Sequence, residues 1–226
     1  MKTFAIIPAA GKGRRSGQLT PKQYIKFAGK ELIVYTLEVF QKNKSVNEII
    51  VAVHPDYFAL LEKVRKKYRL TKISKIVKGG KERQDSVYNA LLSIDADQND
   101  LVAVHDAARP LLPQKVLTNA ILTANKKGNA LVCIKAKDTL VKGTDIVDSY
   151  VDREEVFYVQ TPQVFRYKDL MRAMEAGYAA DFYATDESML IKNLGLKINV
   201  VIGSISNFKI TTEDDLEFLR KHLKSK

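Results

Sequence analysis

The chain has 226 residues and a single cysteine, Cys133, so no intrachain disulfide can form. No apolar run approaches the roughly 20 residues that a membrane-spanning helix needs, and the three histidines lack the paired spacing of zinc ligands. A formal net charge of +11 favours anionic partners: nucleic acids, acidic membrane surfaces or phosphorylated metabolites. Because an apolar stretch follows Met1-Lys2-Thr3 at once, there is no room for a signal peptide, and we expect a cytoplasmic location.

Apolar runs of strand length alternate with stretches of helical periodicity. In chain order they predict strand 4–7, helix 32–40, strand 48–53, helix 57–68, strand 73–77, helix 83–92, strand 101–105, a helix after Pro113, strand 130–135, helices from about 167 and over 186–193, and strand 197–202. Residues 211–215 open a last helix, with Thr as the N-cap and acids in its first turn. This alternation predicts an α/β fold with a mostly parallel sheet and helices on both faces, and residues 1–226 as a single domain.

The alternation breaks between about residues 137 and 158. This segment is rich in Asp, Gly and Thr, with short β-prone pieces at 139–141 and 146–151. They predict a β-arm inserted into the domain and standing off the main sheet. An arm with few contacts of its own would be stabilised by packing on another subunit. An ordinary surface loop without a partner is an equally good interpretation of the sequence alone.

A glycine-rich segment, residues 8–17, follows the first predicted strand. It lacks the Lys-Ser/Thr of a phosphate-binding Walker A loop, and Ser16 stands where a dinucleotide-binding fingerprint starting at Gly11-Lys12-Gly13 needs its third small residue. Hydride transfer is therefore disfavoured. Basic side chains on this loop, with Arg15 and then Lys22, indicate a polyphosphate ligand whose charge they neutralise. Solvated surface charge is the alternative.

Two further loops follow predicted strands. Gly79-Gly80 permits an unusual backbone, and Ser86 lies in the first turns of the next helix, as in the wall of a nucleotide pocket or a plain strand-to-helix turn. Asp106 follows the fourth strand, where a carboxylate can bind a magnesium ion that bridges phosphates; a satisfied turn residue is the alternative. In open α/β sheets such loops converge on one ligand site, which favours the binding interpretation.

These motifs resemble those of the 2-C-methyl-D-erythritol 4-phosphate cytidylyltransferase family of the non-mevalonate isoprenoid pathway. The resemblance covers nearly the whole chain. It is carried, in order, by Pro8-Ala9-Ala10-Gly11-x-Gly13-x-Arg15, Pro21-Lys22-Gln23-Tyr24, Gly79-Gly80 to Ser86, His105-Asp106-Ala107-Ala108-Arg109-Pro110, Asp138-Thr139, Gln160-Thr161-Pro162-Gln163, Thr185-Asp186-Glu187, and Asn207 with Lys209.

The resemblance implies a Rossmann-like nucleotidyltransferase fold and a homodimer joined through the arm, with CTP and 2-C-methyl-D-erythritol 4-phosphate as substrates and Mg²⁺ as cofactor. Catalysis would fall to Arg15 and Lys22. The nucleotide would be bound by Ala9, Ala10, Gly11, Gly80, Ser86 and Ala107. The sugar-alcohol phosphate would be bound by Asp106, Arg109, Thr139, Arg153, Thr161, Thr185 and Lys209, with Thr139 and Arg153 reaching into the neighbouring subunit and Asp106 also holding the metal.

One position departs from the family pattern, and two other functions stay open. Lys81 stands after Gly80 where an acidic residue is usual, so a side-chain contact to the nucleotide is in doubt there. A ribitol-5-phosphate cytidylyltransferase would share the chemistry. A non-catalytic basic module that binds RNA or nucleotides would need aromatic residues interleaved with the basic ones, but only Tyr24 and Phe27 are near them. We therefore expect no nucleic acid as partner, and without a long apolar run we expect no membrane either.

Overall fold

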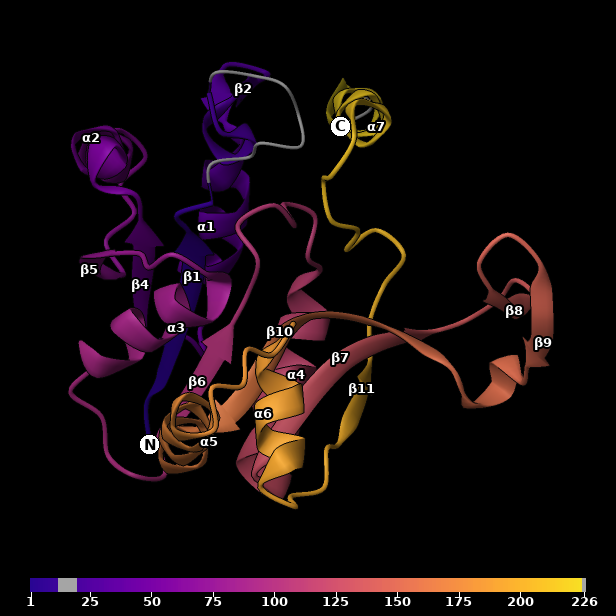
Figure 1. Ribbon diagram of the computed structural model, residues 1–226. Helices are drawn as coiled ribbons and strands as arrows, with labels where there is room; N and C mark the ends of the chain where they lie inside the picture. The colour runs from indigo at the N-terminus through magenta and orange to yellow at the C-terminus, as the bar shows by residue number, and fades with distance from the viewer. Residues whose placement is uncertain (12–19, 225–226) are drawn as a thin grey trace.

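A seven-stranded sheet forms the centre of the molecule (Figure 1). The structure is a computed structural model and describes residues 1–11 and 20–224. The strands, in spatial order, are β11 (Val200–Ile202), β7 (Asn129–Lys135), β10 (Phe157–Arg166), β6 (Leu101–Val104), β1 (Thr3–Ala9), β4 (Glu48–Val53) and β5 (Ile73–Lys78). Strand β10 is antiparallel to both neighbours, while the other pairs in the sheet are parallel. The predicted mostly parallel α/β fold is confirmed.

Helices cover both faces of the sheet. Successive strand residues point to opposite faces, so Ala5 and Ile7 belong to one buried cluster and Phe4 and Ile6 to another. The first cluster lies under α1 (Leu32–Lys42), α2 (Phe58–Lys67) and α4 (Gln114–Lys127). The second lies under α3 (Arg83–Leu92), α5 (Tyr167–Ala179) and α6 (Glu187–Asn193). A third, smaller cluster involves α7 (Glu213–Lys224).

Short elements connect these layers. The 3₁₀ turns are η2 (Lys22–Tyr24), η3 (Pro55–Tyr57) and η4 (Arg153–Glu155), and the two-residue strands β2 (Lys26–Phe27) and β3 (Lys30–Glu31) pair with each other. The predicted strand at 197–202 is shorter than expected, because only its last three residues pair with β7. None of the helices in the described part of the chain is long and apolar enough to cross a membrane.

Strand β10 was not predicted, and it lies between β6 and β7 in the sheet. Its middle reads Gln160-Thr161-Pro162-Gln163, and polar residues with a proline argue against a central strand. The pairing with β7 shifts register between Val159 and Gln163, so the proline lies in an irregularity. The polar side chains are buried because they bond to other segments, as described below.

The arm is present between β7 and β10. Strands β8 (Leu140–Gly143) and β9 (Val147–Val151) pair only with each other and project from the body (Figure 1). The arm was expected to end at about residue 158, and in the structure Phe157 and Tyr158 already pair with β7. Several apolar side chains of the arm are exposed, including Ile146 and Tyr150 at 78% and 76%.

Candidate active site

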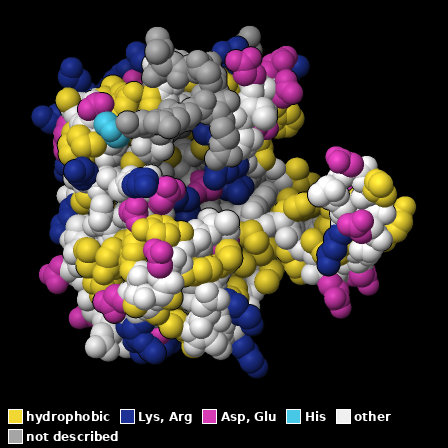
Figure 2. Space-filling model, in the orientation of Figure 1, with side chains coloured by type: hydrophobic (Ala, Val, Ile, Leu, Met, Phe, Trp, Pro, Cys, Tyr) yellow, Lys and Arg dark blue, Asp and Glu magenta, His cyan; other side chains and the backbone are white. Residues whose placement is uncertain are grey.

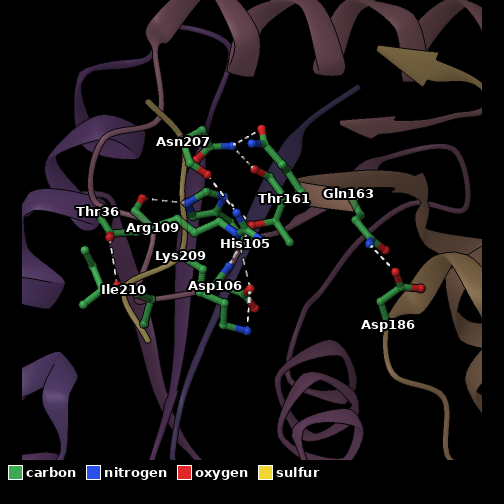
Figure 3. A network of polar contacts seen from close by, with 12 residues as sticks. Thr36, His105, Asp106, Arg109, Thr161, Gln163, Asp186, Asn207, Lys209 and Ile210 are labelled. Carbon is green, nitrogen blue, oxygen red and sulfur yellow. Dashed lines mark hydrogen bonds and ion pairs between the residues drawn. The ribbon is translucent and has the colours of Figure 1, made fainter. Parts of the chain in front are cut away.

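Asp106 lies just after β6, and its carboxylate forms ion pairs with three cationic side chains. Its Oδ1 lies 3.1 Å from Arg83 Nε, and its Oδ2 lies 3.0 Å from Lys209 Nζ and 3.4 Å from Arg109 Nε. Burial would raise the pKa of Asp106, but these cations together hold it far below its usual range. The carboxylate is therefore ionised and fixed at the end of a central strand. Figure 3 shows Lys209 and Asp106 facing each other.

His105 is buried behind this carboxylate, and its hydrogen bonds identify its tautomer. Its Nε2 lies 3.1 Å from the Arg109 carbonyl oxygen, which can only accept, so Nε2 carries the proton. Its Nδ1 then accepts from the Thr161 hydroxyl at 2.9 Å. Burial lowers the pKa of His105 to about 4, so the ring is neutral near pH 7. Both nitrogens are engaged, and the ring supports the Asp106 loop.

Thr161 joins β10 to the Asp106 loop. Its hydroxyl oxygen accepts the Asp106 backbone N–H at 3.1 Å while its hydrogen goes to His105. The hydroxyl is thus already bonded twice within the protein, which leaves one lone pair for a ligand. Asn207 supports the same strand, because its Nδ2 donates to the Thr161 carbonyl at 2.7 Å, and its own carbonyl accepts from Arg109 Nη1 at 2.8 Å.

Lys22, from the N-terminal part of the sequence, contacts the segment that bears Lys209. Its Nζ donates to the Ile210 carbonyl at 2.6 Å, and the Ile210 backbone N–H donates to the Ala108 carbonyl at 2.8 Å. Because Lys209 precedes Ile210, the structure brings the predicted residues Lys22 and Lys209 to one short segment beside the Asp106 loop. On the face drawn in Figure 2, basic and acidic side chains gather in a hollow near the centre.

The two predicted nucleotide loops are in contact. A Cβ on Gly79 would lie 2.2 Å from the Ala10 Cβ, so glycine is required for the loop after β5 to reach the loop after β1. Ser86 is buried; its hydroxyl accepts from the Gly80 N–H at 3.0 Å and donates to the Glu82 carbonyl at 3.1 Å. Ser86 thus holds the Gly79-Gly80 turn.

Ala9 and Gly11 are held by a side chain to which the sequence analysis gave no role. Gln23 Nε2 donates to the carbonyls of both residues, each at 2.8 Å. Ala107, also predicted to bind the nucleotide, is buried, and its carbonyl accepts from the Thr36 hydroxyl at 2.9 Å. The backbone of these loops is therefore fixed by long-range contacts from η2 and α1.

Three predicted residues that the structure describes lie outside this cluster. Thr139 precedes β8 and Arg153 lies in η4, so both belong to the projecting arm; Arg153 Nη1 donates to the Lys137 carbonyl at 3.0 Å. Thr185 is exposed, and its hydroxyl lies 3.0 Å from the Met189 sulfur. Arg15 lies outside the described residues.

Arg83 and Glu187, like Gln23, are polar residues at the site to which the sequence motifs assigned no role. Arg83 begins α3, directly after the Gly79-Gly80 loop, and contacts Asp106 and Glu187, which begins α6. Both lie inside motifs that carried the family resemblance. The only available signal was their position in those motifs, because the partners of Arg83 are 23 and 104 residues away in the chain.

A divalent cation fits this site through one protein carboxylate. Among the described residues, no three His, Cys, Asp or Glu side chains gather as a metal cluster. Mg²⁺ commonly binds through one or two carboxylates together with substrate phosphates. Asp106 suits that mode, because Lys209 contacts it from the open side, where the Lys209 side chain is 42% exposed. Arg83, Arg109 and Lys209 lie around two acids, so the cluster has one more cation than anion, and that balance favours anionic groups.

Comparison with known proteins shows the family to which the chain belongs. A family model described as 2-C-methyl-D-erythritol 4-phosphate cytidylyltransferase matches residues 3–224. A protein of that name from Syntrophus aciditrophicus (strain SB) is 38% identical over 226 residues, which is 99% of this chain and 96% of that protein. Another of that name, from Geotalea uraniireducens (strain Rf4), is 39% identical over 228 residues, covering 100% of this chain and 98% of its own length.

Solved structures agree as well. The 4-diphosphocytidyl-2C-methyl-D-erythritol synthase of Anaerococcus prevotii DSM 20548 superposes with a TM-score of 0.86 at 30% identity, covering 99% of this chain and 96% of the other. The 2-C-methyl-D-erythritol 4-phosphate cytidylyltransferase of Thermus thermophilus gives a TM-score of 0.82 at 27% identity, covering 99% of this chain and 100% of the other. This chain therefore belongs to the 2-C-methyl-D-erythritol 4-phosphate cytidylyltransferase family.

Proposed function

We propose that the Asp106 cluster is the active site of a CTP-dependent cytidylyltransferase. The reaction transfers the cytidylyl group of CTP to 2-C-methyl-D-erythritol 4-phosphate, giving 4-diphosphocytidyl-2-C-methyl-D-erythritol and pyrophosphate, a step of non-mevalonate isoprenoid synthesis. Family membership supports this activity. The structural observation that supports the location is the meeting of Asp106, Arg109, Lys209 and Lys22 at the carboxyl end of the central strands.

The chemistry needs charge neutralisation more than a base. A phosphate oxygen of the sugar-alcohol phosphate attacks the α-phosphorus of CTP in line, and pyrophosphate leaves. The attacking oxygen is already anionic, so no proton must be removed. This agrees with His105, whose two ring nitrogens are bonded to Arg109 and Thr161 and whose pKa of about 4 keeps it neutral. Positioned cations supply the remaining stabilisation of the transition state.

The roles divide between the two substrates. Lys22 and Arg15 act on the triphosphate, and Lys209 and Arg109 bind the phosphate of the sugar alcohol. Asp106 would hold Mg²⁺, which would supply neutralisation of charge on the phosphates. The backbone of Ala9, Ala10, Gly11, Gly80, Ser86 and Ala107 lines the nucleotide side. Since this side is built from backbone groups held by Gln23, Ser86 and Thr36, a lysine at position 81 is compatible with it.

The substrate-binding residues Thr161 and Thr185 come from the same chain, and Thr139 and Arg153 come from the arm of a second copy. The arm supports a homodimer because its apolar side chains are exposed and its strands pair only with each other. An isolated two-stranded hairpin is marginally stable in water, so packing on a partner subunit would account for it.

Methylerythritol phosphate is favoured over ribitol 5-phosphate because the family and the relatives above carry its name. The test is pyrophosphate release from CTP and Mg²⁺ with each sugar-alcohol phosphate in turn. We expect turnover with 2-C-methyl-D-erythritol 4-phosphate to exceed turnover with ribitol 5-phosphate by at least about 100-fold in kcat/KM, about 2.7 kcal/mol. Equal turnover, or none without added nucleic acid, would contradict the proposal.

A further inference from the structure

We propose that Arg83, anchored by Glu187, is a positioning residue that sets the Asp106 carboxylate and joins the nucleotide loop to the segment bearing Thr185. This inference rests on the proposed function of Asp106. It adds a role for two side chains that lie behind the residues expected to touch substrate.

The guanidinium of Arg83 bridges two carboxylates from different parts of the chain. Its Nε lies 3.1 Å from Asp106 Oδ1, and its Nη1 lies 2.6 Å from Glu187 Oε1. Arginine presents its donors in a rigid planar fork, so one side chain fixes both acids at once. Lysine would keep the charge but not this geometry. The opposite oxygen of Asp106 stays with Lys209 and Arg109, on the side where substrate is expected.

Glu187 is a buried acid whose carboxylate is paired with Arg83. Its side chain is 1% exposed, and Arg83 is its charged partner. Burial raises the pKa of Glu187, and Arg83 acts against that rise. Within the described part of the chain, its Oε2 has no hydrogen-bond partner. A buried carboxylate needs a paired charge, so Glu187 is an internal counter-ion that holds Arg83 in position rather than a surface acid.

The residues that follow Arg83 connect the start of α3 to residues 178–184, the segment that leads to Thr185. Gln84 Nε2 donates to the Phe182 carbonyl at 3.3 Å, and Gln84 Oε1 accepts from the Ala184 N–H at 2.9 Å. Asp85 accepts from the Tyr178 hydroxyl at 2.7 Å. Ser86, next in the chain, holds the Gly80 turn on the nucleotide side, so the first turn of α3 links both substrate sides to Asp106.

The experiment compares Arg83→Lys, Glu187→Gln and Asp106→Asn in the full chain, with steady-state kinetics for both substrates. Arg83→Lys should lower kcat about 10- to 100-fold and raise KM for the sugar-alcohol phosphate, with KM for CTP within about twofold. Glu187→Gln keeps a hydrogen-bond acceptor for Arg83, so it should lower kcat by less than about tenfold. The matched control is Arg65→Lys, whose arginine forms a half-buried pair with Glu62 at 3.5 Å, within α2 and apart from the cluster; it should change neither constant.

The double variant Arg83→Lys/Asp106→Asn separates positioning from a general loss of structure. If Arg83 acts through Asp106, the double variant should be no slower than Asp106→Asn alone. The inference would be overturned if the losses in kcat of the two single variants multiplied in the double variant, or if Arg83→Lys left kcat unchanged. In either case a slow Asp106→Asn enzyme would leave the proposed function intact. A fully active Asp106→Asn enzyme would instead overturn the proposed role of Asp106. If Arg83→Lys does not fold, as shown by its circular dichroism, the same cycle with Glu187→Gln decides.

Discussion

The Asp106 cluster and the β8–β9 arm both carry expected site residues, but in opposite physical settings. Asp106 is 8% exposed and is held by three side chains and a backbone N–H bond to Thr161. On the arm, Arg153 is exposed and donates to a carbonyl of the arm base, while Ile146 and Tyr150 are 78% and 76% exposed.

The two regions differ in whether contacts within one chain cover and fix their side chains. The cluster is assembled within one chain, because hydrogen bonds of Asp106, Arg109 and Asn207 join the loop after β6 to β10 and to the segment before α7. The arm exposes apolar surface that a single chain does not cover, and solvent contact of such a patch usually marks an interaction surface. Changes in the cluster should therefore act within one subunit, whereas changes on the arm should act across subunits.

The largest expected effect is on Lys22→Ala. Removing one positioned cation from a phosphoryl-transfer site should lower kcat/KM by about 100- to 1000-fold, about 3–4 kcal/mol at the transition state. Steady-state pyrophosphate release measures it. Lys26→Ala is the control, because Lys26 is exposed in the neighbouring strand β2. A loss of less than about tenfold in the Lys22 variant would be too small for direct charge stabilisation.

The next effect concerns His105 and the stability of the cluster at acidic pH. The folded pKa of about 4 lies below the ordinary value of 6.5, so the unfolded chain binds a proton first as the pH falls. The stabilisation is complete above about pH 6.5 and is lost toward pH 4, at about 1.4 kcal/mol per pH unit. Urea unfolding with EDTA at pH 7.5, 6 and 5 measures this slope. His105→Gln should flatten it; an unchanged slope would show that another group titrates.

The third prediction tests whether the arm works across subunits. Arg153→Ala should lower kcat/KM about 10- to 100-fold through loss of a charged hydrogen bond. Co-expressing Arg153→Ala chains with Lys22→Ala chains should restore about a quarter of wild-type activity. Random pairing makes about half of the dimers mixed, and each mixed dimer has one site with an intact Lys22 and a partner arm with an intact arginine. No restoration in purified mixed dimers would mean that each arm serves its own subunit.

The sequence predicted the regular parts of both regions and not the contacts between them. Periodic apolar runs placed most strands and the hairpin. Strand β10 was missed because Gln160 and Gln163 read as loop residues. Gln163 is fully buried, yet it bonds to Asp186 and to the Ser188 N–H, more than twenty residues away. Such long-range pairing is invisible to local patterns.

For the candidate site, the family motifs named individual residues but not the contacts that hold them. Lys22 was expected at the nucleotide and Asp106 and Lys209 at the sugar-alcohol phosphate, and in the structure all three lie around one loop. The support behind them was not anticipated, because Arg83 and Gln23 act through partners that only the fold brings close. Thr161 was expected at the substrate, and the structure adds its two bonds to His105 and the Asp106 backbone.

The smallest expected effect on folding comes from Ile146→Ser at the tip of the arm. At 78% exposure the side chain buries little apolar surface within its own chain, so the unfolding free energy of the subunit should change by less than about 0.5 kcal/mol. The same change should weaken self-association, seen by sedimentation equilibrium at decreasing protein concentration. Ile50→Ala is the contrast: Ile50 is 1% exposed in β4, so about 2–5 kcal/mol of stability should be lost. If Ile146→Ser leaves association intact, the arm does not carry the interface, and the exposed position of Thr139 and Arg153 would need an explanation within one chain.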